Sequence, residues 1–151
     1  GAPVSVDLER LRELFRSAPF MADLGIEPTG LTDGRLSTVM TIMPRHLQHT
    51  GTVHAGVMVS MADHTMGIAA QVQAPAGQWI LTAELKTSLL RPGLGERLLC
   101  EAWVLKPGRA LSFTEAEVYA ERQGRRTLVM KASATMAVVA AERLTTTPDA
   151  S

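Results

Sequence analysis

Residues 53–71 constrain the fold more than any other stretch, because they are apolar almost throughout and long enough for one helix of about five turns. The polar interruptions are Ser60, Asp63, His64 and Thr65. A helix that is apolar on nearly all sides is stable in water only when other elements cover it. We therefore expect this helix to be buried on most sides by the rest of the chain.

Strand patterns on both sides of the helix can provide this cover. From Gly25 the apolar period becomes two, and an Asp33-Gly34 turn signal predicts two strands joined as a hairpin and ending near Pro44. Four long strands are predicted after residue 77, at residues 79–90, 97–106, 110–122 and 125–139. A curved antiparallel sheet wrapped around the helix would bury it, which predicts an α+β fold with one long central helix.

The chain ends are expected to differ from this central unit. After Ser5 or Asp7 as N-cap, apolar residues at helical spacing predict a short amphipathic helix. With 151 residues the chain fits one domain. We expect an N-terminal helix and leader at residues 1–19, the main domain at residues 20–140 and a flexible tail at residues 141–151.

Charge and composition exclude several classes of function. Fifteen basic residues balance fifteen acidic ones, so no overall field favours nucleic acid or an anionic membrane as partner. Cys100 is the only cysteine and can form no internal disulfide, which suits a reducing compartment. The sequence has neither a signal-peptide pattern nor an apolar run that could span a bilayer, so we expect a cytoplasmic location.

Asp63 is the ionisable side chain that most needs explaining. A carboxylate on an apolar helix is costly unless it is paired, hydrogen-bonded or used in chemistry. Asp63 is therefore a candidate catalytic residue, and a structural bond to backbone N–H groups is the alternative.

The His54-Ala55-Gly56 segment opens the same helix. The first N–H groups of a helix have no intrahelical acceptor and lie at the positive end of its dipole, which suits an oxyanion. Alternatively, Gly56 only lets the helix approach the sheet closely. We expect the ring of His54 to bond to the backbone and fix this turn.

The clustering of all four histidines within nineteen positions raises the question of a metal site. No Cys or Glu completes a ligand set, and Asp63 would be the only nearby carboxylate, so the sequence favours no metal. His64 is next to Asp63 but about 100° further round the helix, so we expect it to point elsewhere.

The segment His46-Leu-Gln-His-Thr-Gly-Thr-Val-His-Ala-Gly-Val-Met-Val-Ser-Met-Ala-Asp63 resembles the His-Gly-Gly…Leu-x-Asp signature of hotdog-fold acyl-CoA thioesterases of the PaaI and 4-hydroxybenzoyl-CoA type. Leu90-Arg-Pro-Gly and Val104-Leu-Lys-Pro-Gly-Arg-Ala-Leu-Ser-Phe113 also look like that family's strand and turn text. The similarity covers about residues 20–139, and the motifs appear in order. The resemblance implies the hotdog fold and thioester hydrolysis.

The resemblance also implies roles for single residues. Asp63 matches the general base or nucleophile, Ala55 and Gly56 match the oxyanion donors, and Thr82 matches a hydroxyl that assists from the next strand. Gln48 matches an amide that positions water or carbonyl. Ala55 stands where Gly is usual and Gln48 where Asn is common.

Coenzyme A is implied as part of the substrate, with no other cofactor. Cations and small residues at strand ends and turns are the candidates for binding its phosphates, although each cation taken alone is better explained as a solvated turn charge. The candidates are Arg91, Lys106, Gly108, Arg109 and Ser112.

Geometry predicts that two chains share the site. On one helix Asp63 and Ala55 lie about 12 Å apart along the axis, too far to act on one carbonyl. Two central helices lying antiparallel would bring Asp63 of one chain to the Ala55-Gly56 amides of the other. We therefore expect a homodimer, assembled further into a dimer of dimers.

Two other functions remain open at this stage. The same fold could bind acyl-CoA without turnover, or act as a hydratase or dehydratase, which would need a His and carboxylate pair in a different motif. The acyl group is also open, because eight methionines suggest an adaptable pocket that suits arylacetyl, benzoyl or medium-chain groups.

Overall fold

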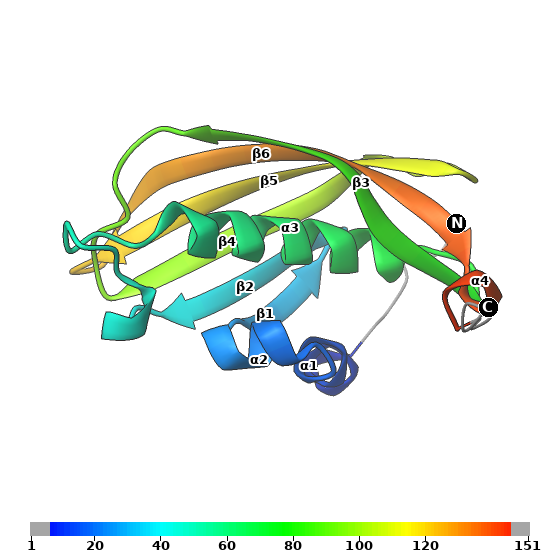
Figure 1. Ribbon diagram of the computed structural model, residues 1–151, viewed down its shortest axis with the longest axis horizontal. Coiled ribbons are helices and arrows are strands. Elements are labelled where there is room, and N and C mark those ends of the chain that lie inside the picture. Colours follow the sequence, from blue (N-terminus) through cyan, green and yellow to red (C-terminus); the bar gives the residue numbers. More distant parts are fainter. Residues whose placement is uncertain (1–6, 146–151) are drawn as a thin grey trace, which may run out of the picture.

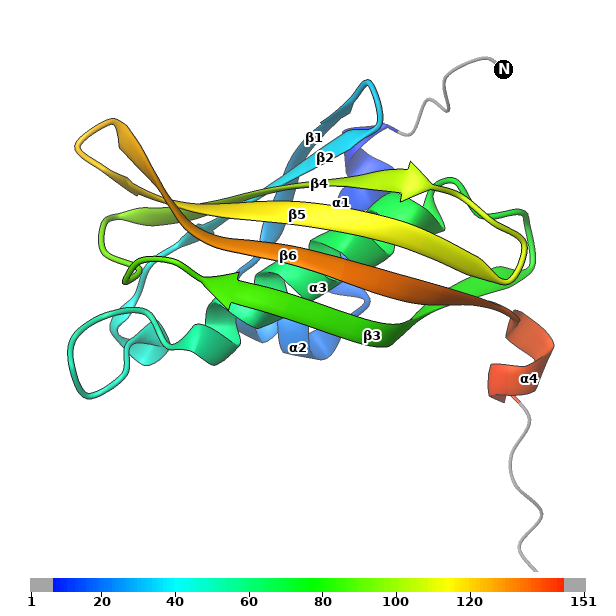
Figure 2. The same ribbon diagram turned by 90° about the horizontal axis from the view of Figure 1, so that it is seen from above.

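A six-stranded antiparallel sheet curves around one long helix in the computed structural model, which describes residues 7–145 (Figures 1 and 2). The elements in chain order are α1 (Leu8–Arg16), α2 (Pro19–Leu24), β1 (Glu27–Thr32), β2 (Arg35–Thr41), the 3-10 helix η1 (Pro44–His46), α3 (Ala55–Gln71), β3 (Gln78–Leu89), β4 (Arg97–Lys106), β5 (Leu111–Arg122), β6 (Arg125–Ala140) and α4 (Ala141–Thr145). The strand order is β1-β2-β4-β5-β6-β3. This confirms the predicted α+β fold with a central helix.

Tight turns determine the register of the hairpins. Asp33 and Gly34 both have positive φ, at 51° and 78°, as a two-residue hairpin turn of the primed type requires. Gln123 and Gly124 repeat this geometry between β5 and β6, with φ values of 51° and 77°. In this sheet β3 pairs only with β6 and therefore forms one edge, and β1 forms the other.

The core lies between one side of α3 and the concave face of the sheet. Met58, Met61 and Met66 of α3 are buried there, and the hydroxyls of Thr65 and Thr38 share a hydrogen bond of 2.9 Å across the interface. The sheet covers α3 on this side only. On the other side the cover within the single chain is incomplete, because Ala55, Val59, Asp63 and Gly67 remain partly exposed there.

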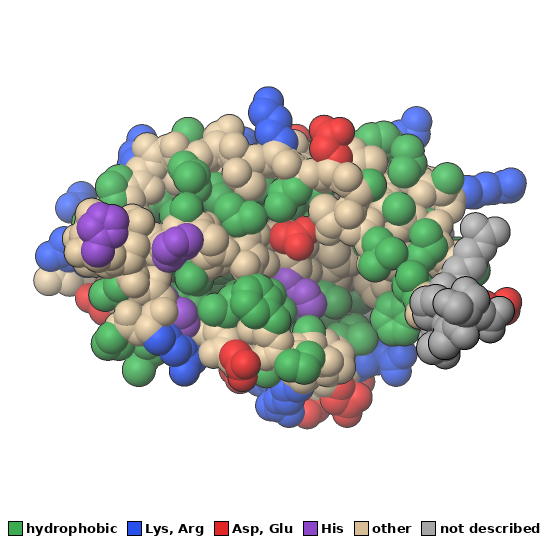
Figure 3. Space-filling model, in the orientation of Figure 1, with side chains coloured by type: hydrophobic (Ala, Val, Ile, Leu, Met, Phe, Trp, Pro, Cys, Tyr) green, Lys and Arg blue, Asp and Glu red, His purple; other side chains and the backbone are tan. Residues whose placement is uncertain are grey.

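The open side of α3, together with β3, forms one face of the molecule (Figure 3). Uncharged surface covers much of this face, and most Lys and Arg side chains gather at its rim (Figure 3). None of the described helices is long and apolar enough to cross a membrane.

The N-terminal segment has one more helix than the sequence predicted. Asp7 caps α1 by accepting a bond of 2.8 Å from the Arg10 N–H, as expected for one of the two candidate caps; Ser5 lies outside the described residues. The additional helix α2 is only six residues long, with Pro19 at its start and Gly25 in the left-handed region at its end. The first five residues of the expected C-terminal tail form α4, and residues 146–151 lie outside the described chain.

Candidate active site

The centre of the site is the pair formed by Asp63 and Thr82. Asp63 occupies the middle of α3, and the Thr82 hydroxyl on β3 donates a 2.6 Å hydrogen bond to its Oδ1. Asp63 is partly exposed and accepts no other hydrogen bond from the described residues. Oδ2 is therefore free to accept a proton from a molecule that enters from the open face.

A β-bulge in β3 positions Thr82. The register against β6 shifts between Thr82 and Glu84, so the strand changes which residues face α3. Before the bulge Ile80 and Thr82 face the helix, and after it Leu85 is partly buried against the core. The bulge thus lets one strand direct the polar side chain of Thr82 towards Asp63 and the apolar side chain of Leu85 towards the core.

The start of α3 supplies one free backbone donor. His54 is the N-cap, and its Nδ1 accepts a 2.8 Å hydrogen bond from the Gly56 N–H, which agrees with the structural role expected for its ring. The Gly56 N–H is thus occupied, which corrects the expectation that both amides are available to an oxyanion. The Ala55 N–H has no acceptor among the described residues and points away from the helix body.

A cavity of about 530 Å³ lies beside this donor. Gln48, Ala55 and Arg91 line it together, with Met58 at its apolar side. The Gln48 amide donates to the Thr52 hydroxyl at 2.7 Å, which holds its side chain across the loop before α3. The Arg91 guanidinium donates to the Leu128 carbonyl oxygen at 2.8 Å and is otherwise exposed.

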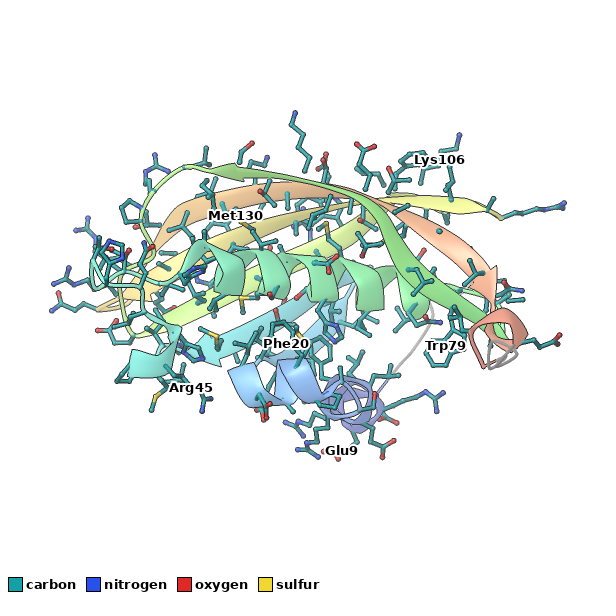
Figure 4. The ribbon with its side chains drawn as sticks, viewed as in Figure 1. Glu9, Phe20, Arg45, Trp79, Lys106 and Met130 are labelled. Carbon is teal, nitrogen blue, oxygen red and sulfur yellow. The ribbon has the colours of Figure 1, made fainter. Side chains whose placement is uncertain are left out.

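The remaining candidates for coenzyme A binding lie at the opposite end of the molecule. Lys106 is the last residue of β4, and Gly108 and Arg109 belong to the β4–β5 turn. Gly108 and Arg109 line a cavity with Gln73, just beyond the end of α3. Figure 4 shows Lys106 at this end and Arg45 near the end where α3 begins. A side chain at Gly108 would collide with the Leu111 carbonyl oxygen at 2.2 Å, so glycine is required by the turn itself.

Ser112 belongs to the core rather than to this turn. Its side chain is only 4 % exposed, on the face of β5 that is turned towards α3. It is not accessible to a ligand at the surface of the molecule, and we do not place it in the binding site.

The structure thus brings the predicted residues together in three groups. Asp63 contacts Thr82, Gln48 lies near Ala55 and Arg91, and Arg109 lies with the β4–β5 turn. Within one chain, Asp63 does not meet the free amide at the start of α3, because eight residues of helix separate them.

Two of the histidines before the body of α3, His46 and His54, have structural roles. His46 is buried, with Nδ1 accepting from the Met43 N–H and Nε2 bonding the Leu24 carbonyl at 2.9 and 2.8 Å. Among residues 7–145 no three His, Cys, Asp or Glu side chains are arranged to hold a metal ion.

The position of His64 differs from the one that the sequence predicts. It lines the same cavity as Asp63 instead of pointing away from it, and its ring packs edge-on against Phe15 at 4.7 Å. Its Nε2 is buried with no hydrogen-bond partner among the described residues. Burial lowers the pKa of the imidazole below its ordinary value, opposed by the nearby Asp63 carboxylate, so the ring is neutral at pH 7.

Comparisons with known proteins agree with this geometry. The family model of the thioesterase superfamily matches residues 50–127. A thioesterase family protein from Silicibacter pomeroyi, solved as a crystal structure, is 32 % identical with a TM-score of 0.83, covering 87 % of this chain and 97 % of that one. A Bacillus halodurans protein solved with CoA is 25 % identical with a TM-score of 0.64, over 68 % of this chain and 70 % of that one.

A Caenorhabditis elegans protein assigned to the esterases is 30 % identical over 101 residues. The alignment covers 66 % of this chain and 59 % of the relative, so the chain spans less than two thirds of that protein.

Proposed function

The chain belongs to the thioesterase superfamily, and we propose that it hydrolyses acyl-CoA thioesters at a site to which two copies of the chain contribute. The observation that carries the proposal is the Asp63–Thr82 pair, a carboxylate with one oxygen held at 2.6 Å and the other open to the uncovered face of α3. The thioesterases to which the chain is similar support thioester hydrolysis as the general activity.

The proposed reaction begins with a water molecule beside Asp63. The carboxylate takes a proton from the water as its oxygen attacks the thioester carbonyl, and Thr82 holds the carboxylate in position. The negative charge that develops on the carbonyl oxygen is stabilised by the Ala55 N–H at the positive end of the α3 dipole. The carbon–sulfur bond then breaks, and the proton held by Asp63 passes to the leaving thiolate, giving free acid and coenzyme A.

The donor in this reaction comes from a second copy of the chain. Asp63 and Ala55 of one helix are separated by about 12 Å along its axis, whereas the partly exposed side of α3 can pack on the same side of another chain. An antiparallel arrangement brings each Asp63 to the other chain's Ala55 and gives two equivalent sites in a homodimer. Sedimentation that finds a fully active monomer at assay concentration would rule out this shared site.

The proposed binding groups for coenzyme A are the cations near the two ends of α3. The Bacillus halodurans relative was solved with CoA, which supports binding of this group in the fold. Arg109 and Lys106 are exposed and flank the β4–β5 turn, where they can bind phosphates without burying charge. Arg91 adds a third cation, which lines a cavity together with Ala55 at the start of α3.

The experiment that tests the proposal measures thiol release from a panel of acyl-CoAs by the parent and by Asp63→Asn. Loss of a positioned general base costs about 10²- to 10⁴-fold, and this loss should appear in kcat with the fold intact. Thr82→Val should give a smaller loss in kcat, because it leaves the carboxylate but removes its positioning bond. Asp23→Asn, on exposed α2, is the matched control and should be neutral.

The outcomes separate the possible functions. No thiol release combined with tight binding of acyl-CoA would identify a binding module, and turnover of an enoyl-CoA without thiol release would identify a hydratase. If a well-folded Asp63→Asn protein keeps kcat within about tenfold of the parent, Asp63 is not the general base.

A further inference from the structure

A cavity of about 310 Å³ extends from Asp63 and Thr82 towards the N-terminal helix. Its walls come from three elements: α1 contributes Leu14, α3 contributes His64 and Ile68, and β3 contributes Trp79 and Leu81. We call this cavity the α1–β3 pocket. It is mainly apolar, and the candidate catalytic carboxylate lies at one end of it.

The described residues bring no permanent cation to the pocket. Among residues 7–145, neither Lys nor Arg lines it, and Asp63 is its only acidic side chain. The neighbouring His64 packs against Phe15 and is neutral at pH 7 because burial lowers its pKa. A group with a terminal carboxylate would therefore lie beside an anion with no positive charge to compensate it, whereas an uncharged apolar group would be stabilised by burial.

The far end of the pocket is closed by a contact between α3 and β3. The Gln71 side chain donates to the Gln78 carbonyl at 2.9 Å and accepts from the Ile80 N–H at 3.0 Å, so it holds the end of the helix against the strand. Beyond it lies a second cavity of about 480 Å³, which also has Leu14, Gln71 and Trp79 in its lining. These three side chains therefore separate the two cavities.

Trp79 is the larger and more accessible part of this wall. Trp79 is 45 % exposed, so it is not held in place by the core, and Figure 4 shows it at the start of β3, near α4. Replacing it with a small residue should join the two cavities without removing a core side chain.

We propose that the acyl group of the substrate occupies the α1–β3 pocket of the chain that supplies Asp63, that this group is uncharged and apolar, and that Trp79 and Gln71 limit its length. The inference rests on the proposed thioesterase function. It places the acyl group on the side of Asp63 that leads to α1, while coenzyme A extends towards the cations at the rim.

The test is the acyl-length profile of kcat/KM, measured with straight-chain acyl-CoAs from acetyl to palmitoyl and with a chain that ends in a carboxylate. For the parent, kcat/KM should rise about fourfold per added methylene until the pocket is full and then fall. The chain with a terminal carboxylate should be a poor substrate at every length.

Trp79→Ala should shift the optimum to longer chains and raise kcat/KM by about tenfold or more for the first chain that the parent rejects. Ile68→Phe should narrow the pocket and shift the optimum to shorter chains. Trp103→Ala is the matched control: Trp103 lies on β4 over the Arg35 guanidinium at 4.1 Å, outside the pocket, and its loss should leave the profile unchanged. Sedimentation of each variant shows whether its assembly is intact.

The result that would overturn the proposal is an active enzyme whose profile is the same in the parent, Trp79→Ala and Ile68→Phe, or one that prefers the carboxylate-terminated chain. If no acyl-CoA releases thiol, the proposed function fails instead. Calorimetric titration with non-hydrolysable thioether analogues of the same chains then tests the location of the acyl group by the same comparison of affinities.

Discussion

The Ala55 N–H offers a direct test of oxyanion stabilisation, because it can be removed with little disturbance of the fold. Ala55 is the first residue of α3, a position where proline is favoured since its ring fixes a helical φ and the missing N–H has no helical acceptor. The residue before a proline must be extended, and His54 already has φ −60° and ψ 134°. Ala55→Pro therefore deletes the donor and breaks no hydrogen bond within the described chain.

The expected effect follows from what one such donor contributes. Removal of a single oxyanion-hole donor costs about 10²- to 10³-fold in kcat, or about 2.7 to 4 kcal/mol. KM should change little, because the neutral ground-state carbonyl gains less from the bond than the oxyanion does. The melting temperature should stay close to that of the parent, since the cap between His54 and the Gly56 N–H remains.

The assay is thiol release, detected with a chromogenic disulfide. Cys100, the only cysteine, is buried, and burial raises the pKa of its thiol to about 12, so the folded protein adds little background. Ala55→Gly is the matched control, because it changes the side chain and keeps the N–H. A folded Ala55→Pro enzyme with kcat within about threefold of Ala55→Gly would refute the assignment of this amide as the oxyanion donor.

Two further predictions concern charge. Arg109→Ala should raise KM for acyl-CoA in a salt-dependent manner with kcat nearly unchanged, whereas Arg16→Ala on α1 should have no effect; an unchanged KM at low salt contradicts the role of Arg109. His64 has a folded pKa below its ordinary value of 6.5, so below about pH 6.5 the unfolded chain binds a proton that the folded chain excludes. As the pH is lowered through this range, the free energy of unfolding should therefore fall by up to about 1.4 kcal/mol per pH unit. Denaturant titrations between pH 5 and about pH 8 should show this slope in His49→Asn and a reduced slope in His64→Asn.

The sequence predicted the long elements closely because each one ends at a strong turn signal. The central helix was expected within residues 53–71 and runs from Ala55 to Gln71, and the four later strands begin and end within about one residue of their predicted ranges. The short helix α2 was missed, since six residues are too few to show a period. The β3 bulge was missed as well, because no side chain marks it and only pairing with β6 reveals it.

The sequence could suggest candidate site residues only where they share a local motif. Asp63, Ala55 and Gln48 belong to one continuous segment, and its resemblance to the thioesterase signature suggested their roles. The α1–β3 pocket depends on tertiary contacts: His64 packs against Phe15 of α1, and Gln71 bonds the backbone of β3. The directions of these side chains follow from how α1 and β3 pack on α3, which a helical period of 3.6 cannot specify.

The shared site also predicts the register of the two helices. If Asp63 of one α3 faces Ala55 of the other in a twofold pair, the axis must pass midway between them, at Val59, so that each Val59 faces its partner's. Ala55, Val59 and Asp63 are spaced four residues apart and follow one stripe of α3.

Antiparallel helices packed about 8 to 10 Å apart bring facing Cα atoms within the range of a disulfide. Val59→Cys should therefore form a disulfide-linked dimer under mild oxidation, with buried Cys100 unreactive. Gly67→Cys, further along the partly exposed side of α3, is the matched control and should not cross-link, because it lies eight residues from the axis. Efficient cross-linking of Gly67→Cys with none at Val59→Cys would show that the helices pair in another register, and Asp63 would then not reach the Ala55 amide.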